Sequence, residues 1–231
     1  MTLFIDTANI EEIKKYLSFG IISGITTNQK VFSLEQGIDY KQQIQELLQF
    51  NLPVSIELTK THDWSVEELF KEGFDLMCEF GQNIVVKVPM WKDGKGLEVA
   101  KKLIANAVKV NMTCLMNVNQ VILACEIGAT YASLFYNRII DYIMRGLLSS
   151  REIAKGIVKD SSSITVKYGH KTKLICGSTR EPQDVSECLL SGADIVTVTP
   201  KVLEQLPFHP KTEETIQEFD NAWKQFLGEK K

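Results

Sequence analysis

The sequence has no run of basic residues, and its basic and aromatic residues do not interleave. It also has no apolar stretch that approaches the ~18 residues of a membrane span. The formal net charge is −3 at pH 7. These features disfavour nucleic-acid and membrane-surface binding, so we expect neither kind of partner. The first residues lack the basic segment and apolar core of a secretory signal, and we therefore expect a cytoplasmic protein.

Cysteine and histidine are scarce. The five cysteines are odd in number, lie far apart and form no Cys-x-x-Cys pair. This pattern predicts reduced thiols, most of them small core residues, rather than a disulfide framework. The three histidines, His62, His170 and His209, do not have the spacing of metal ligands. We therefore predict no metal site and no cofactor.

The chain also lacks low-complexity segments and any linker rich in glycine, serine or proline, so residues 1–231 are predicted to form a single domain. Apolar strand-like runs alternate with helical patterns along its whole length. We predict strands at Thr2–Asp6, Ile21–Thr27, Val54–Leu58, Ile84–Pro89, Val110–Leu115, Tyr131–Phe135, Leu174–Gly177 and Ile195–Thr199. Helices are predicted at Ile10–Leu17, Tyr40–Gln49, Val66–Glu79, Leu97–Ala107, Val118–Ile127, Pro182–Leu190 and Thr212–Leu227, with a short one from Pro200. A long helical region after the sixth strand is predicted to break near Ser149.

Eight strands, each followed by a helix, predict an α/β protein with a (β/α)8 TIM barrel and an extra C-terminal helix at about residues 212–227. An open, doubly wound sheet is the alternative architecture. It is disfavoured because no glycine-rich phosphate-binding fingerprint follows the first strand.

One strand, Ile84–Pro89, carries a lysine among aliphatic residues. Lysine is rarely buried unless it is paired, and burial favours the neutral amine that forms Schiff bases with carbonyl substrates. Lys87 is therefore a candidate nucleophile. A structural lysine paired with a carboxylate, or one that extends to the strand end, is an equally weighted interpretation of this strand taken alone.

Other polar residues stand at the predicted strand ends, where TIM barrels have their active sites. Asp6 and Glu57 are candidate proton carriers beside Lys87. Capping of the first helix is the alternative role for Asp6, and an ion pair with Lys87 is the alternative for Glu57. Arg138 and Arg180 follow the sixth and seventh strands and are candidate anion ligands, with surface salt bridges as the alternative. Hydroxyls at the other strand ends are more often structural, and these are Thr26, Thr113, Ser133, Ser178 and Thr197.

Six motifs together resemble the small transaldolase family, which includes fructose-6-phosphate aldolase. The resemblance extends from about Thr2 to Trp223. The motifs are FIDTAN at Phe4–Asn9, GITTN at Gly24–Asn28, VVKVP at Val85–Pro89, NMTCL at Asn111–Leu115, GATYASLF at Gly128–Phe135 and GADIVTVTPKVLEQL at Gly192–Leu206.

The resemblance implies a (β/α)8 barrel with class I aldolase chemistry. Lys87 would form the imine with a ketose, and Asp6 would be the general acid and base. Glu57 and Thr113 would hold the water that relays protons. The substrate-binding residues would be Asn28 and Ser133 at the dihydroxyacetone unit, Arg138, Ser178 and Arg180 at the terminal anion, and also Thr26 and Phe135.

Glu57 and Phe135 resemble the transaldolases of this family, because its aldolases tend to have glutamine and tyrosine at these positions. We therefore expect transfer of a dihydroxyacetone unit to an aldose phosphate. An aldolase that releases free dihydroxyacetone is one alternative, and a non-catalytic barrel that binds a sugar phosphate is another.

The family patterns TTNP, SPFVGR and AS-F-R become TTNQK, SLFYNR and GSTR here. These changes lie around the distal end of the substrate, so the donor is expected to be fructose 6-phosphate or 6-deoxy-6-sulfofructose. The resemblance also implies a homo-oligomer, such as a pentamer or decamer, in which the C-terminal helix packs on a neighbour. Its apolar residues could instead pack on its own barrel, and these are Phe219, Trp223, Phe226 and Leu227.

Overall fold

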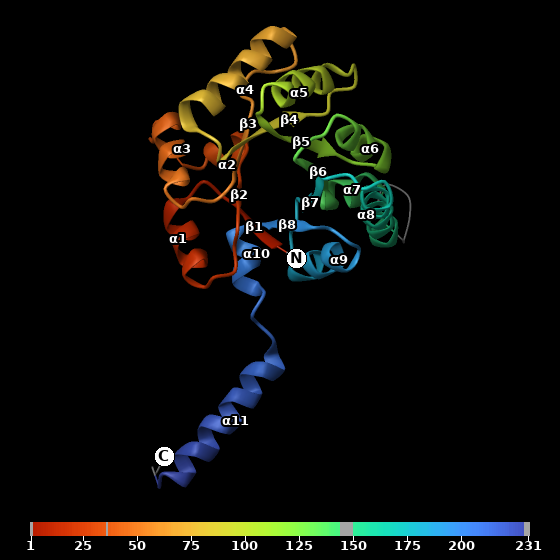
Figure 1. Cartoon of the computed structure of the whole chain (residues 1–231). Helices are drawn as coiled ribbons and strands as arrows, with labels where there is room; N and C mark the ends of the chain where they lie inside the picture. The colour runs from red at the N-terminus through yellow and green to blue at the C-terminus, as the bar shows by residue number, and fades with distance from the viewer. Residues whose placement is uncertain (1, 36, 144–149, 229–231) are drawn as a thin grey trace.

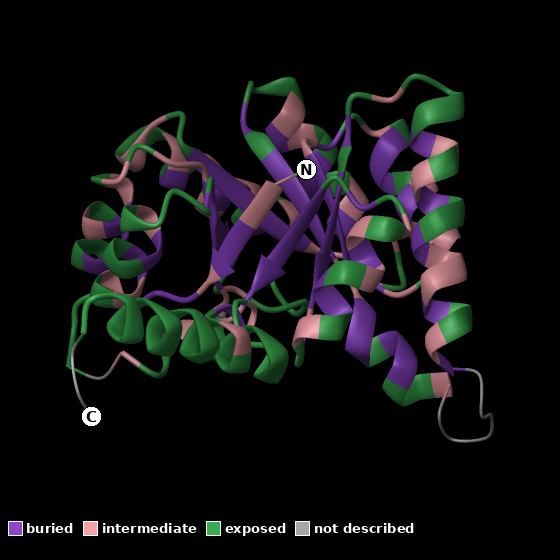
Figure 2. Ribbon diagram, turned by 90° about the horizontal axis from the view of Figure 1, so that it is seen from below, coloured by how far each residue is buried: buried purple, intermediate pink, exposed green. Residues whose placement is uncertain are grey.

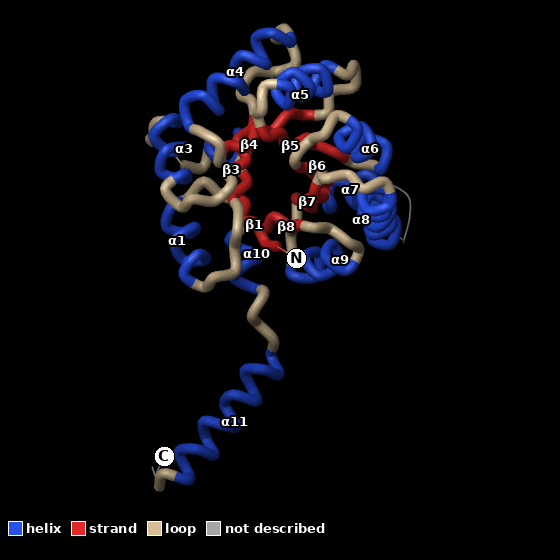
Figure 3. Tube along the Cα trace, in the orientation of Figure 1, coloured by secondary structure: helices blue, strands red, loops and turns tan. Residues whose placement is uncertain are grey.

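The computed structural model describes residues 2–35, 37–143 and 150–228. Eight parallel strands form a closed barrel in the order of the sequence, and the last strand pairs with the first. Figures 1 and 3 show the strands as a central ring with helices around it. The predicted (β/α)8 barrel is therefore confirmed. The strands are β1 (Thr2–Asp6), β2 (Ile25–Thr26), β3 (Val54–Glu57), β4 (Ile84–Pro89), β5 (Lys109–Leu115), β6 (Tyr131–Phe135), β7 (Lys173–Gly177) and β8 (Ile195–Val198).

Except for α11, the helices cover the outside of the barrel, and most of them agree with the predicted ranges. Their buried residues face the strands, while their outer faces are exposed (Figure 2). The predicted break near Ser149 lies outside the described residues, between α7 and α8. The helices are α1 (Ile10–Ser18), α2 (Gln29–Phe32), α3 (Tyr40–Leu48), α4 (Val66–Phe80), α5 (Lys95–Ala105), α6 (Val118–Glu126), α7 (Tyr136–Ile143), α8 (Ser150–Lys167), α9 (Pro182–Leu190), α10 (Pro200–Gln205) and α11 (Pro210–Phe226).

The second strand is shorter than predicted. The prediction of strand from Ile21 is wrong because β2 spans only Ile25–Thr26. The preceding segment still hydrogen-bonds to β1 through Ser23 N to Leu3 O, at 3.0 Å. A Cβ at Gly24 would lie 2.4 Å from the ring of Phe4, so only glycine lets the chain pass this ring.

Inside the barrel an apolar layer supports a polar layer. Phe4, Val85, Tyr131, Ile175 and Ile195 form one buried cluster, separate from the larger core between strands and helices. Successive strand residues point to opposite faces, so residues two positions further along point inward as well. Those residues include Asp6, Lys87, Ser133 and Thr197, and the alternation therefore brings polar groups together at the C-terminal ends of the strands.

The helix α11 extends away from the barrel (Figure 1). None of its residues is buried, and Phe219, Trp223 and Phe226 are 68%, 61% and 77% exposed. In the structure this helix therefore does not pack on its own barrel. Its apolar side chains are left facing outward.

Candidate active site

A cavity of about 860 Å³ opens at the C-terminal ends of the strands. Its wall contains groups from all eight strands, so residues far apart in the sequence meet in one space. Ten of the eleven predicted site residues line it, and these are Asp6, Thr26, Asn28, Glu57, Lys87, Thr113, Ser133, Phe135, Arg138 and Ser178.

Lys87 lies on β4 and is 5% exposed. Its Nζ donates a hydrogen bond to the carbonyl oxygen of Thr27 at 2.7 Å and lies 3.3 Å from Oε2 of Glu57. Glu57 is brought there by strand register, because it is the partner of Lys87 across β3 and β4. The carboxylate is thus placed to exchange a proton with the amine. The ion pair between Lys87 and Glu57, which was the alternative to a nucleophilic Lys87, is present, and both residues line the cavity.

Asp6 faces Lys87 from β1. Burial raises the pKa of its carboxyl, although the positive charge of Lys87 and a hydrogen bond from Thr26 act in the opposite direction. The hydroxyl of Thr26 lies 3.0 Å from Asp6 Oδ1 and 2.5 Å from the hydroxyl of Thr197. Helix capping, the alternative role for Asp6, is performed by Asn9, whose Oδ1 accepts from Glu12 N at 3.1 Å. Asp6 therefore remains available for proton transfer in the cavity.

The hydrogen-bond directions of two polar side chains are set by their neighbours. Oδ1 of Asn28 accepts from Val31 N at 3.0 Å and caps α2, so its amide group can donate to a ligand. The hydroxyl of Ser133 donates to Asn111 Oδ1 at 2.7 Å, and Asn111 donates to Ser55 Oγ at 3.3 Å. The Ser133 oxygen therefore presents its lone pairs to the cavity. Neither the role of Asn111 nor the helix α2 was predicted.

Thr113 is fully buried, and its hydroxyl has no hydrogen-bond partner among the described residues. It lines the cavity together with Cys114, where the β5–β6 register shifts and φ of Cys114 is +62°. Burial, together with the charge of Glu57, raises the pKa of the Cys114 thiol. A buried hydroxyl is costly without a partner, which makes Thr113 suited to bind a polar group in the cavity.

The two predicted arginines occupy different places. Arg138 is exposed at the rim of the cavity, and it has no ion pair with any described residue. Arg180 points elsewhere, because its Nη1 and Nη2 lie 2.8 and 2.5 Å from the two carboxylate oxygens of Asp141. The hydrogen bond from Arg180 lowers the pKa of Asp141. Arg180 is the one predicted site residue that does not line the cavity.

The cavity also has residues that sequence reasoning did not select. Lys30 follows β2 and Lys201 follows β8, so they stand on either side of the β1 end. Lys30 is exposed. Arg138 follows β6, which lies opposite β2 in the ring of eight strands. The cavity therefore has cationic groups on two sides.

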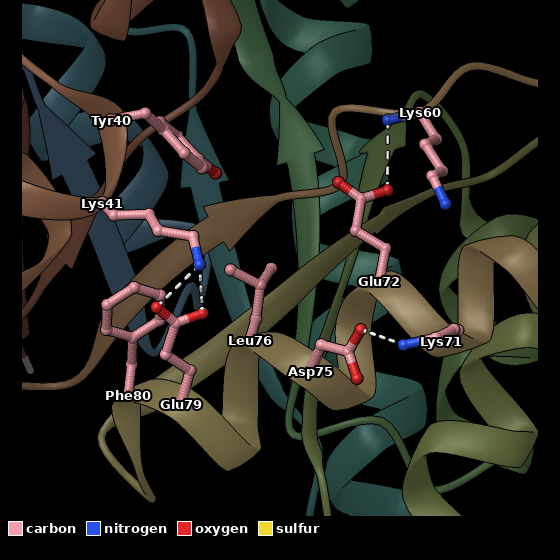
Figure 4. A pocket seen from close by; sticks show the side chains of 9 residues that line it. All are labelled: Tyr40, Lys41, Lys60, Lys71, Glu72, Asp75, Leu76, Glu79 and Phe80. Carbon is pink, nitrogen blue, oxygen red and sulfur yellow. Dashed lines mark hydrogen bonds and ion pairs between the residues drawn. The ribbon is translucent and has the colours of Figure 1, made fainter.

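A second hollow, of about 330 Å³, lies between α3 and α4 (Figure 4). Most of its charged side chains already have partners. Lys41 pairs with Glu79 at 2.7 Å and Lys71 with Asp75 at 2.6 Å, while Glu72 accepts from Lys60 N at 3.1 Å. This hollow does not combine a nucleophile with free proton carriers, so the barrel cavity is the candidate site.

The described ranges contain no group of three or more His, Cys, Asp or Glu side chains placed to hold a metal ion. No helix within those same ranges is both long and apolar enough to cross a membrane. All five cysteines are free thiols, and Cys125, Cys176 and Cys188 are buried.

Comparisons with solved structures identify the fold. A structure described as native KDPGal has a TM-score of 0.53 at 11% sequence identity, and the match covers 85% of this chain and 81% of that one. A lactate oxidase, described as putative, from Pediococcus acidilactici has a TM-score of 0.52 at 14% identity, over 88% and 64% of the two chains. At such low identity these likenesses concern the barrel alone.

Sequence comparisons are more specific. A probable transaldolase of Agathobacter rectalis is 37% identical over 230 residues, which are 99% of this chain and 100% of that protein. A probable transaldolase of Lactiplantibacillus plantarum is 37% identical over the full length of both chains. The family model for transaldolase/fructose-6-phosphate aldolase matches residues 3–230. The chain therefore belongs to the transaldolase/fructose-6-phosphate aldolase family of enzymes.

Proposed function

We propose that the protein is a transaldolase that moves a dihydroxyacetone unit from a C6-anionic ketose to an aldose phosphate, through a Schiff base on Lys87. The observation that carries the proposal is the meeting of Lys87, Glu57 and Asp6 in one cavity, with Lys87 Nζ 3.3 Å from Glu57. One group attacks the carbonyl carbon, and two carboxyl groups carry protons to and from it.

The first steps form the imine. Lys87 passes a proton to Glu57, and the neutral amine attacks the C2 carbonyl of the ketose. The carbinolamine then takes a proton on its hydroxyl and loses water, which leaves a protonated imine. Thr113 and Glu57 would hold the water that relays these protons. The unpaired hydroxyl of Thr113 supports that role.

The next steps break and form carbon–carbon bonds. Asp6 removes the proton of the C4 hydroxyl, the C3–C4 bond breaks, and its electron pair moves into an enamine on Lys87. The aldose leaves, and the aldehyde carbon of the acceptor takes its place. Bond formation then reverses the sequence, with Asp6 returning the proton, and hydrolysis of the imine frees the new ketose. The raised pKa of Asp6 suits this exchange, because a proton carrier works best with a pKa nearer the working pH.

The hydrogen-bond directions of Asn28 and Ser133 fit a polyol. The Asn28 amide would donate to one hydroxyl oxygen of the dihydroxyacetone unit, and the Ser133 oxygen would accept from another hydroxyl. One side chain of this pair binds a hydroxyl that accepts a hydrogen bond, and the other binds a hydroxyl that donates one. It would hold the three-carbon unit while the rest of the donor leaves.

Transfer is favoured over release by Phe135. This side chain lines the cavity without a hydroxyl, so it cannot organise a water that protonates the enamine. The enamine would therefore persist until an acceptor aldehyde arrives. The alternative function is an aldolase that releases free dihydroxyacetone.

The charged end of the donor would reach Arg138 and Ser178. Arg138 has no competing ion pair among the described residues and lies at the rim. Arg180 would join them only after exchanging Asp141 for the ligand. A phosphate and a sulfonate both fit such cations, so fructose 6-phosphate and 6-deoxy-6-sulfofructose are both candidate donors, and sulfoglycolysis is a candidate setting beside the pentose phosphate pathway.

The assembly and location are proposals as well. The exposed apolar side chains of α11 would be covered by a neighbouring copy in a homo-oligomer, such as a pentamer or decamer. Free thiols are in keeping with a cytoplasmic protein.

The test is reductive trapping. Borohydride with donor ketose should add one substrate-derived mass to the wild-type chain at Lys87, as read by intact mass and peptide mapping. Lys87→Ala should take up no label, and Lys92→Ala, a loop lysine, should behave as the wild type does.

The alternatives give different results. A wild-type chain that binds the ketose but is never labelled would be a non-catalytic sugar-phosphate-binding barrel. A labelled chain that releases dihydroxyacetone as fast as it transfers it would be an aldolase. Label at Lys30 or Lys92 would refute the assignment of Lys87.

A further inference from the structure

A buried carboxylate lies behind the rim of the cavity, at the start of α9. The side chain of Asp184 is 0% exposed. Its Oδ2 accepts hydrogen bonds from Asn137 Nδ2 at 2.6 Å, from Arg180 N at 2.7 Å and from Glu181 N at 3.2 Å. Its Oδ1 accepts from Arg151 Nη2 at 2.9 Å. One acidic group therefore joins α7, α8, the loop after β7 and the start of α9.

Asn137 extends the same connection toward the cavity. It is 6% exposed, and its Nδ2 donates both to Asp184 and to the carbonyl oxygen of Ser178, at 2.9 Å. The next residue along the chain is Arg138. The amide of Asn137 thus holds the backbone that carries Arg138 against the backbone that carries Ser178, and both of those residues line the cavity.

The loop that is held in this way has a strained backbone. Ser178 has φ of +62°, a conformation that L-residues with a Cβ rarely adopt. Such strain persists only where the surrounding structure determines it, and it collects at ligand-binding segments. The bonds to Ser178 O and Arg180 N help to fix this segment from outside the loop, together with the bonds from Thr179 Oγ1 to Thr197 O and from Arg180 to Asp141.

The charge of Asp184 is also matched. Arg151 reaches Asp184 from α8 and pairs with Glu181 and Glu187 as well. Tyr136, fully buried at the start of α7, donates to Glu187 at 2.7 Å. A buried carboxylate with donors on both oxygens is held in one position, because the loss of any one donor leaves a desolvated lone pair without a hydrogen bond.

We propose that Asn137 and Asp184 are positioning residues that fix the distance between Arg138 and Ser178, and thereby preform the subsite for the anionic end of the donor. This inference rests on the proposed function, because it assigns that end of the ketose to this side of the cavity. A preformed subsite binds an anion without the cost of ordering the loop. Loss of the connection should weaken binding of charged ligands and leave neutral ketoses nearly unaffected.

The experiment compares Asn137→Ala and Asp184→Asn with the wild type, using fructose 6-phosphate and fructose as donors. For fructose 6-phosphate we expect KM to rise by about fivefold or more, since one lost hydrogen bond at the subsite corresponds to roughly that factor, while kcat changes by less than about twofold. For fructose both constants should stay within about twofold of the wild type.

Thr172→Val is the matched control. It removes a buried hydrogen bond of 2.7 Å, from Thr172 Oγ1 to Ala129 O, at the opposite end of the barrel. The control should lower the melting temperature without separating the two ketoses. Equal losses for charged and neutral ketoses in Asn137→Ala would overturn the proposal, and so would unchanged kinetics. If Asp184→Asn does not fold, Asn137→Ala alone decides.

A second readout separates this inference from the proposed function. Inorganic phosphate should bind the wild-type chain in a calorimetric titration, more weakly to Asn137→Ala and least to Arg138→Ala. If the wild type transfers no dihydroxyacetone unit but shows this order of phosphate affinities, the subsite stands and the proposed reaction fails. Equal phosphate affinity in the wild type and Asn137→Ala, or no binding to the wild type, refutes the subsite.

Discussion

Replacing Lys87 with methionine leaves a carboxylate inside the barrel without its cation. Glu57 and Lys87 are 12% and 6% exposed in their side chains, and their charged atoms lie 3.3 Å apart. At an effective dielectric constant of about 20, the attraction at this separation is about 5 kcal/mol before desolvation is subtracted. The carbonyl oxygen of Thr27 also loses its donor, at a cost of about 1 kcal/mol or more.

Methionine offsets part of this loss in the free energy of unfolding, because it packs in an apolar strand and has no charge to desolvate. Removing one partner of a buried ion pair costs about 3–5 kcal/mol. The Glu57 carboxylate keeps some contact with water, which favours the lower end of that range. We therefore expect Lys87→Met to lower the free energy of unfolding by about 2–4 kcal/mol. For a domain of this size that corresponds to a fall in melting temperature of roughly 5–12 °C.

The assay is a double-mutant cycle with Glu57→Gln, followed by chemical denaturation and calorimetry. The double variant should be more stable than Lys87→Met, because its glutamine carries no charge to strand in the barrel. Purely additive losses, or a Lys87→Met variant as stable as the wild type, would refute the ion pair in the resting site. The proposed proton transfer from Lys87 to Glu57 would then lack the ion pair from which it starts.

Four further predictions concern the cavity, its neighbour Arg180 and the helix α11. Asp6→Asn should abolish transfer yet raise the melting temperature at neutral pH. The raised pKa means that the folded protein binds the Asp6 proton more tightly than the unfolded chain does, so the stability of the wild type falls as the pH rises from the unfolded to the folded pKa. The difference in melting temperature between the variant and the wild type should therefore disappear below about pH 4. Phe135→Tyr should increase release of free dihydroxyacetone in the absence of acceptor, measured by a coupled reductase assay; no increase would contradict the role of the missing hydroxyl. Arg138→Ala should lower kcat/KM for C6-charged ketoses by about tenfold or more but hardly for fructose, and Arg180→Ala should lower it less, because Asp141 already holds that guanidinium. Trp223→Lys on α11 should reduce the mass in sedimentation if this helix joins copies, and an unchanged mass would contradict that role.

The barrel could be predicted because it depends on local periodicity, and periodicity also places several polar residues at the strand ends, whereas the roles of the site residues were inferred from the family resemblance. Alternating strand and helix patterns specified the topology, and polar residues such as Lys87 interrupt apolar runs where the strands end. Inward-facing positions recur every second residue, so a sequence that places Val85 inside also places Lys87 inside.

What could not be predicted depends on partners distant in the sequence. The guanidinium of Arg180 is directed by Asp141, which is on another helix, and nothing near Arg180 signals that pairing. Asn111 resembles an ordinary strand residue until Ser55 and Ser133 are placed on either side of it. The short β2 and the contact of Gly24 with the ring of Phe4 likewise depend on residues that are distant in the sequence.

Closure of the ring by β1 and β8 has a consequence for the timing of biosynthesis. Phe4 is paired with Thr197, and the Thr197 hydroxyl meets Thr26 beside Asp6. Asp6 leaves the ribosome among the first residues, yet its surroundings are complete only when the last strand has been made and has docked. A chain that lacks β8 lacks the Thr197 hydroxyl that meets Thr26 and the strand that pairs with Phe4, so we expect no sugar cleavage from it. Transfer of the dihydroxyacetone unit should therefore appear in arrested nascent chains only after β8 has left the ribosome, and catalysis itself would report that the barrel has closed.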